Sequence, residues 1–342
     1  MTENRQRNLL GIIAAILIFS VFAVLYSGGR RKEPISATAF KLNTIIKITI
    51  YDSQDEKLLQ DAVALCDTYE NIFSRTKPES ELYRLNHGML PEKDGWITLS
   101  EPLAELIAEG LKYSRLSEGA FDISVAPLSS LWDFTSGENV IPDAQKLETA
   151  RELVNYEDIS LEDRKIRFAK EGMQLELGAI AKGYIADRIK EFLVAGGIKS
   201  AVIDLGGNVL CVGRKPDKEP FRIGVQKPFA TRNQTIGTAE ITDRSIVSSG
   251  IYERYFEKDG VLYHHILNPQ DGYPYRNGLV SVTIFSEKSV DGDALSTACF
   301  ALGPEKGLEL IDQLPDMQAV FITEDGTMRY SENFENEVRL TD

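Results

Sequence analysis

The sequence predicts an α+β protein in which mixed or antiparallel sheets are flanked by helices. Apolar and polar residues alternate across Thr44–Tyr51, which is typical of a strand. Apolar residues recur at helical spacing across Asp55–Phe73. Helical segments also interleave with hairpin-like pairs, as in Ile159–Glu176, instead of alternating one by one with strands. This order favours α+β over a doubly wound parallel sheet.

The N-terminal residues predict a single transmembrane helix. Leu9–Tyr26 carries no charge and has basic residues on both sides. Its length is at the lower end for a spanning helix and long for a signal-peptide core. We therefore expect an uncleaved anchor, with a cleaved signal as the alternative. The resulting division is a tail (1–8), the anchor or signal segment (9–26), a linker (27–36) and a catalytic domain (37–342). No strand is expected before Thr44, because Glu33–Ala39 is interpreted as linker.

Charge and cysteine content restrict location and partners. Basic residues at both ends of the apolar run hardly decide its orientation, but the short tail favours export of the rest. We expect a cell-membrane protein with an extracytoplasmic catalytic domain. The net charge of −14 argues against nucleic acid as a partner. Three cysteines without metal-like spacing predict buried free thiols.

The later elements are expected in a clear order. Leu99–Ser117 has the pattern of a helix that ends where Ser117–Asp122 begins. Further expectations are strands at Lys165–Phe168, Met173–Glu176, Ser200–Leu205, Val261–Ile266 and Leu279–Phe285, a strand-rich region over Phe221–Phe256, and helices ending at Gly196 and spanning Asp293–Leu302.

The most informative stretch is Leu175–Ile189. A short apolar alternation leads into small residues and then into helical periodicity. Free N–H groups and the helix dipole favour an anion at such a helix start, and Lys182 adds a positive charge. A tight turn with no ligand is the simpler interpretation of this stretch taken alone. It matches neither the P-loop nor the dinucleotide fingerprint.

Asp293 and Thr297 form a second candidate group. At i and i+4 they share one helix face. A carboxylate and a hydroxyl one turn apart are oxygen donors of the kind that Mg²⁺ takes beside phosphate oxygens. Taken alone, the segment is more simply interpreted as a helix cap at Asp293 with a small buried residue at Thr297.

Three further features have both a functional and a structural interpretation. His264 and His265 point to opposite faces if they lie on a strand, so one can act as a base or phosphate partner while the other is exposed. Asp204–Asn208 either lines the floor of a site or forms a hairpin turn. Trp132 and Phe134 either stack on a planar ring or belong to the core. Together these features indicate a nucleotide-processing site. They combine a possible phosphate-binding helix start, a pair of oxygen donors, a histidine and two aromatic rings.

Seven motifs, in order, resemble those of the ApbE family, the FAD:protein FMN transferases, over nearly all of the chain beyond the anchor. They are SELYRLN (Ser80–Asn86), SEGAFDISVAPLSSLWDF (Ser117–Phe134), LELGAIAKGYIAD (Leu175–Asp187), AVIDLGGNV (Ala201–Val209), SSGIYERYF (Ser248–Phe256), HHILNPQDGYP (His264–Pro274) and DALSTA (Asp293–Ala298).

The resemblance implies an enzyme that binds FAD and Mg²⁺, cleaves the pyrophosphate, releases AMP and attaches FMN to a threonine or serine of a target redox protein. Some relatives mainly hydrolyse FAD, so an Mg²⁺-dependent FAD pyrophosphatase is the alternative. A non-catalytic flavin-binding module is a third hypothesis. The Asp293 and Thr297 pair argues against it, because a pure binder needs no metal donors.

The resemblance also implies site residues. The metal would be held by Asp293, Thr297 and the backbone carbonyl of Ala179, and His265 would be the base for the acceptor hydroxyl. The implied FAD contacts are Leu42, Ala120, Phe121, Asp122, Glu176, Lys182 and Leu267.

The chain departs from the family pattern at four places. Thr76 is a small polar residue where an aromatic is frequent, and Ile251 stands where an acidic residue is common. Leu42-Asn43-Thr44 replaces Met-Gly-Thr, and Asn268 replaces aspartate. None of these departures removes a proposed metal ligand or Lys182.

Overall fold

The structure is a computed structural model that describes residues 33–231 and 234–341. The predicted anchor at 9–26 lies outside the described residues. Within them, every helix is too short or too polar to cross a membrane.

A central eight-stranded sheet organises the fold, and each pair of neighbouring strands in it is antiparallel. This confirms the predicted α+β class with antiparallel sheets. The strand order is β1 (Ile35–Lys41), β2 (Thr44–Ile50), β7 (Ser200–Leu205), β8 (Asn208–Gly213), β11 (Ser245–Gly250), β14 (Leu279–Ser286), β15 (Gln318–Thr323) and β16 (Met328–Tyr330).

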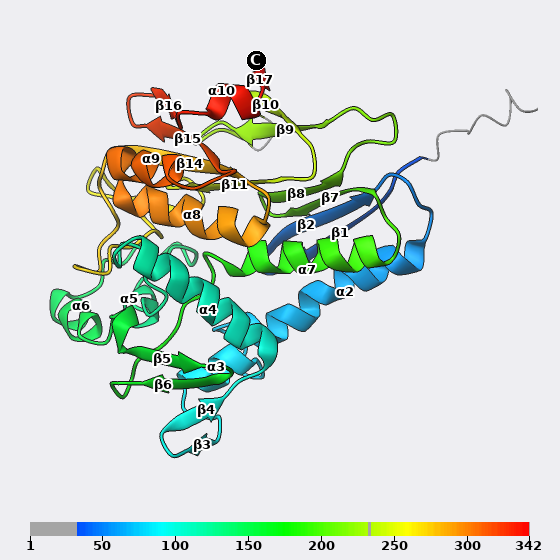
Figure 1. Ribbon diagram of the computed structural model, residues 1–342. Helices are drawn as coiled ribbons and strands as arrows, with labels where there is room; N and C mark the ends of the chain where they lie inside the picture. The colour runs from blue at the N-terminus through cyan, green and yellow to red at the C-terminus, as the bar shows by residue number, and fades with distance from the viewer. Residues whose placement is uncertain (1–32, 232–233, 342) are drawn as a thin grey trace, which may run out of the picture.

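Helices and a small sheet cover the two faces of this sheet (Figure 1). On one face lie α2 (Glu56–Phe73), α7 (Ala181–Ala195), α8 (Ser289–Leu302) and α9 (Pro304–Asp312). The other face carries β9 (Phe221–Gln226), β10 (Thr235–Ile241) and β17 (Leu340–Thr341), with α10 (Phe334–Glu337). Strand β14 is buried at every position because both of its faces are covered.

A second region packs below the helices (Figure 1). It contains α3 (Glu81–Asn86), α4 (Glu101–Leu116), α5 (Ala126–Ser129), α6 (Ala144–Arg151), the 3₁₀ turn Tyr156–Asp158 and the sheet of β3 (Glu92–Lys93), β4 (Trp96–Thr98), β6 (Lys165–Phe168) and β5 (Ile159–Glu162). A separate hairpin joins β12 (Tyr255–Lys258) to β13 (Val261–His264). Both histidine candidates therefore lie where this hairpin ends.

Local sequence explains the strongest elements. The apolar stripe of α2 is buried as predicted, and Asp55 caps the helix by accepting a hydrogen bond from the Leu58 backbone nitrogen at 2.9 Å. The three cysteines are buried and free, as expected.

Three expectations of secondary structure are wrong. Glu33–Ala39 is not a linker throughout, because β1 pairs with β2 across a two-residue turn in which Leu42 and Asn43 have positive φ. Met173–Glu176 is extended but not part of a sheet, since β6 pairs with β5 instead. Helix α8 begins four residues before Asp293.

Candidate functional site

The start of α7 and the start of α8 are joined by two carboxylates. Asp293 on α8 accepts a hydrogen bond from the backbone nitrogen of Gly183 at 2.8 Å. In return, Asp187 on α7 accepts from the backbone nitrogens of Ser289 and Val290, at 2.8 and 2.9 Å. Each carboxylate thus satisfies N–H groups that a helix start leaves without partners.

Glycine at position 183 makes this approach possible. A Cβ atom there would lie 2.3 Å from the carbonyl oxygen of Ser289 and 2.7 Å from the Cα of Val290. Any side chain would therefore push α8 away from α7. The small residue seen in the sequence serves helix packing, and the same packing brings Asp293 to the helix start.

The anion expected at the start of α7 is the chain's own carboxylate. The sequence interpretation assigned the free N–H groups there to a phosphate, but the N–H of Gly183 is taken by Asp293. That part of the phosphate-binding prediction is therefore wrong. Lys182 remains near the site and forms no ion pair with any residue that the structure describes.

The same hydrogen bond leaves the carbonyl of Ala179 without a partner. In a continued helix the N–H of Gly183 would bond to the carbonyl of residue 179. Because Asp293 accepts it instead, the Ala179 oxygen accepts no hydrogen bond from the described part of the chain. A carboxylate, an unused carbonyl and the hydroxyl of Thr297 are hard oxygen donors, and this donor set fits Mg²⁺. Within residues 33–231 and 234–341, no group of three His, Cys, Asp or Glu forms an alternative metal cluster.

Asn208 ends the Asp204–Asn208 segment that was a candidate site floor, and it lies near Asp293, although it was not among the predicted site residues. Gly206 and Gly207 have positive φ and form the turn between β7 and β8. The segment Asp204–Asn208 therefore contains a hairpin turn, as its structural interpretation predicted. The turn delivers Asn208, which is 1% exposed, to the side of Asp293. Burial raises the pKa of Asp293, while the charge of Lys182 and the hydrogen bond from the Gly183 backbone oppose this rise. An asparagine directly after two glycines was the available signal in the sequence.

The hydroxyl groups of Ser249, Ser296 and Thr297 lie close together. The Oγ of Ser249 on β11 lies 2.7 Å from the Oγ of Ser296 and 3.1 Å from the Oγ1 of Thr297. Ser296 donates to the main-chain carbonyl of Asp293 at 2.9 Å. Sequence reasoning missed Ser249, although it lies within the quoted SSG motif.

The two histidines have different environments. His264 is buried, and its ring nitrogens contact the Tyr275 carbonyl at 2.9 Å and the Ile266 nitrogen at 3.3 Å. His264 therefore has a structural role, and it is not the exposed member of the pair. His265 follows β13 and has Nδ1 3.3 Å from the carbonyl of Arg254. Donation from Nδ1 leaves Nε2 as the acceptor.

Electrostatics keep His265 neutral. Burial and the charges of Arg254 and Lys182 lower the pKa of His265 to about 3. Burial also lowers the pKa of His264, to about 4. The charge of Lys182 acts on both His265 and Asp293, so this lysine lies near the candidate base and near the candidate metal ligand.

Glu176 and Leu42 lie in two different parts of the fold, and each is held by local contacts. The carboxylate of Glu176 pairs with Arg75 and accepts from the backbone of Gly178 at 3.2 Å. Leu42 occupies the β1–β2 turn. A Cβ on Gly206 would strike the Thr44 side chain at 2.2 Å, so this turn lies against the glycine turn before Asn208.

The Ala120–Asp122 loop is tied to the histidine segment by Tyr275. Its hydroxyl donates to the Ala120 carbonyl at 2.9 Å, and its backbone nitrogen donates to Ile266 at 3.0 Å. The side chain of Phe121 lies in the core. Asp122 accepts hydrogen bonds from the backbones of Ser124 and Tyr156. These two side chains therefore support the loop, and its backbone is the part left for a ligand.

The two aromatic rings belong to a small core. Trp132 and Phe134 stack on each other at 5.5 Å, and Trp132 is buried against Phe256 and Leu267. The core interpretation is thus the one the structure supports. Leu267 is a buried member of this small core.

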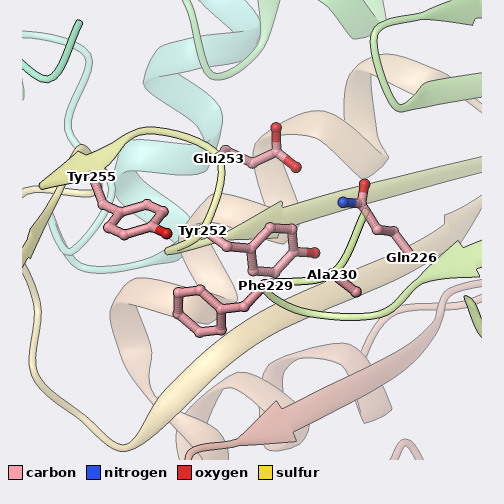
Figure 2. Close-up of a pocket in the computed structure, with 6 residues that line it drawn as sticks. All are labelled: Gln226, Phe229, Ala230, Tyr252, Glu253 and Tyr255. Carbon is pink, nitrogen blue, oxygen red and sulfur yellow. The ribbon is translucent and has the colours of Figure 1, made fainter. Parts of the chain in front are cut away.

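An open pocket lies where β11 leads into β12. Phe229, Tyr252 and Tyr255 form its aromatic side, and Figure 2 shows Gln226 and Glu253 beside them. The ring of Tyr252 packs on Gly250, the residue after Ser249. The pocket therefore lies between the loop that follows β9 and the segment that connects Ser249 to Arg254, whose carbonyl contacts His265.

The fold and the site define an α+β protein in which a carboxylate of one helix caps the start of another, close to a lysine and a histidine. The chain belongs to the ApbE family, whose model matches residues 42–321. A FAD:protein FMN transferase of Klebsiella pneumoniae is 37% identical over 292 residues, covering 84% of this chain and 89% of that protein. One of Treponema pallidum is 32% identical, covering 97% and 96%.

Solved structures show the same architecture. The flavin transferase ApbE of Vibrio cholerae superposes with a TM-score of 0.79 at 25% identity, covering 89% of this chain and 99% of its own. The ApbE protein of Thermotoga maritima gives a TM-score of 0.80 at 30% identity, covering 90% and 100%. The α+β arrangement is therefore the ApbE fold.

Proposed function

We propose that this protein is an Mg²⁺-dependent FAD:protein FMN transferase that attaches FMN to a threonine or serine hydroxyl of a target protein and releases AMP. The proposal is supported by the hydrogen bond that places Asp293 at the start of α7, next to Lys182 and the unused carbonyl of Ala179. Thr297 follows Asp293 one turn later on the same face of α8. Curated relatives of nearly full length carry the name of this activity.

Asp293, Thr297 and the Ala179 carbonyl would hold the cation. When bound, Mg²⁺ would neutralise negative charge on the pyrophosphate. Lys182 adds a second positive charge for the phosphates, and the backbone of Ala120–Asp122, together with Leu42, Glu176 and Leu267, supports FAD binding around them. Holding the pyrophosphate in a fixed orientation is the main contribution that such residues make to phosphoryl transfer.

His265 would remove the proton of the acceptor hydroxyl. Its neutral ring has Nε2 free to accept while Nδ1 donates to Arg254. In the transfer, the acceptor oxygen bonds to the FMN phosphorus and its proton moves to Nε2. The bond from this phosphorus to the bridging oxygen breaks, and AMP leaves with that oxygen. The low pKa makes His265 a weak base in the free protein, and a bound pyrophosphate would strengthen it by offsetting the two nearby cations.

One experiment separates transfer from hydrolysis. The protein is incubated with FAD, Mg²⁺ and a polypeptide that contains one threonine, and products are followed by mass spectrometry and in-gel flavin fluorescence. FMN on the threonine, with one AMP per FMN attached, is the expected result. FMN and AMP without labelling would identify an FAD pyrophosphatase, and bound but intact FAD would overturn both enzymatic assignments.

We also propose that residues 9–26 anchor the catalytic domain outside the cytoplasm, where it modifies membrane or exported redox proteins. The support is the uncharged run with its flanking basic residues. Protease added to intact cells should digest the catalytic domain. Complete protection until the cells are lysed would contradict this topology.

A further inference from the structure

The hydroxyl groups around the proposed metal ligands form a directed chain. Ser296 has one proton, and it donates that proton to the carbonyl of Asp293. The hydrogen bond between Ser249 and Ser296, at 2.7 Å, must then use the proton of Ser249. The hydrogen bond between Ser249 and Thr297, at 3.1 Å, must in turn use the proton of Thr297. Only this assignment gives all three bonds a donor and an acceptor.

The direction of these hydroxyl hydrogen bonds determines where the lone pairs of Thr297 point. A neutral hydroxyl binds a cation through a lone pair and needs another acceptor for its proton. Because Thr297 donates to Ser249, its lone pairs are turned away from β11. A reversed chain would instead point a proton of Ser249 at Thr297 and engage one of those lone pairs.

We propose that Ser249 and Ser296 are positioning residues that orient the Thr297 hydroxyl for cation binding. Ser249 comes from β11 and Thr297 from α8. The hydrogen bonds between these hydroxyl groups therefore also join the central sheet to the helix that carries both ligands. Removing a side chain that hydrogen-bonds to a metal ligand typically weakens metal affinity by about 10–100-fold. The inference rests on the metal role of Asp293 and Thr297 proposed above.

The neighbouring residue supplies a matched control. Ser248 lies on the same strand and points to the opposite face, where its hydroxyl bonds to that of Thr283 at 2.8 Å. Ser248→Ala therefore removes one hydroxyl and one hydrogen bond from the same strand without touching Thr297.

The test measures binding of Mn²⁺ alone, a hard cation that replaces Mg²⁺, to the full chain by electron paramagnetic resonance. Ser249→Ala should raise the Kd about tenfold, and Ser248→Ala should leave it unchanged. In a double-mutant cycle, adding Ser249→Ala to Thr297→Ala should cause no further loss, because Ser249 acts through Thr297. Thermal unfolding of each variant checks that the fold persists.

The outcomes separate this inference from the proposed function. If Asp293→Ala binds Mn²⁺ as tightly as the unchanged protein, the metal site itself is wrong. If Asp293→Ala loses binding and Ser249→Ala keeps it, only the hydroxyl chain is wrong. Equal losses in Ser249→Ala and Ser248→Ala, or additive losses in the cycle, would also overturn the orienting role.

Discussion

The carboxylate of Asp293 accepts the backbone N–H of Gly183 at 2.8 Å and in doing so releases the carbonyl of Ala179. One hydrogen bond therefore caps α7, holds α8 against it and frees a main-chain oxygen. The proposed ligands depend on each other through this bond. Their arrangement follows from the packing of α8 against α7.

Asp293→Asn and Asp293→Ala should separate the structural and the metal-binding role of this residue. Asparagine keeps an oxygen for the N–H of Gly183 but loses the charge, so it should fold normally and lose Mg²⁺-dependent turnover. Alanine also removes the cap and should cost about 1–2 kcal/mol of stability. Chemical denaturation and turnover with and without EDTA measure the two effects. Full activity in Asp293→Asn would contradict the metal assignment.

Gly183→Ala should destabilise the protein by about 1–3 kcal/mol, because its Cβ would collide with the backbone of Ser289 and Val290. Displacement of α8 should also weaken Mg²⁺ binding. Gly178→Ala is the matched control. Its Cβ would meet only the far end of the Glu176 side chain, at 2.9 Å, and no backbone atom, so its stability should be nearly unchanged. Similar midpoints in urea for both variants would refute the packing argument.

His265→Ala should reduce transfer by about 10²–10⁴-fold while the Kd for FAD stays within about threefold of the unchanged protein. His87→Ala, at an exposed histidine stacked on Tyr83, should alter neither quantity. Fluorescence titration and a labelling time course give the two numbers. Loss of FAD binding in His265→Ala would reassign the residue to a binding role.

The pH profile tests the electrostatic environment of His265. Since its pKa lies at about 3, the ring stays neutral as the pH falls from 8 to 5. The ratio of kcat/KM between the unchanged protein and His265→Ala should therefore be constant over this interval, at saturating Mg²⁺. A ratio that falls near pH 6.5 would show that the histidine titrates at its ordinary pKa.

His264 should make the fold sensitive to acid. Its pKa is about 4 when folded and near 6.5 when unfolded, so below pH 6.5 the unfolded chain binds more protons. The stability that this neutral histidine contributes is complete above pH 6.5 and is lost as the pH falls toward 4. His264→Asn, which has an acceptor for Ile266 and a donor for Tyr275, should lack this contribution. Unfolding free energies from pH 7 to 4.5 should fall more steeply for the unchanged protein, and parallel curves would contradict the prediction.

Periodic segments were predicted well because their pattern is local. The apolar residues of α2 recur at helical spacing, and those of β2 alternate with polar residues, so each pattern indicates which side faces the core. Both elements lie where they were expected. Strand β1 was missed because it is an edge strand in which half-buried and exposed positions alternate among small and polar residues. Its pairing with β2 depends on the turn at Leu42 and Asn43, whose positive φ values carry little sequence signal.

By itself, the sequence determined the family through ordered motifs, the pairing of Asp293 with Thr297 on one helix face, and the importance of the stretch around Lys182. The tertiary structure decided what those residues do to each other. It placed the carboxylate, not a phosphate, on the N–H of Gly183, and it added Asn208 and Ser249. The reason is physical: spacing along a helix is a local property, whereas the partner of a helix terminus comes from whichever element packs against it.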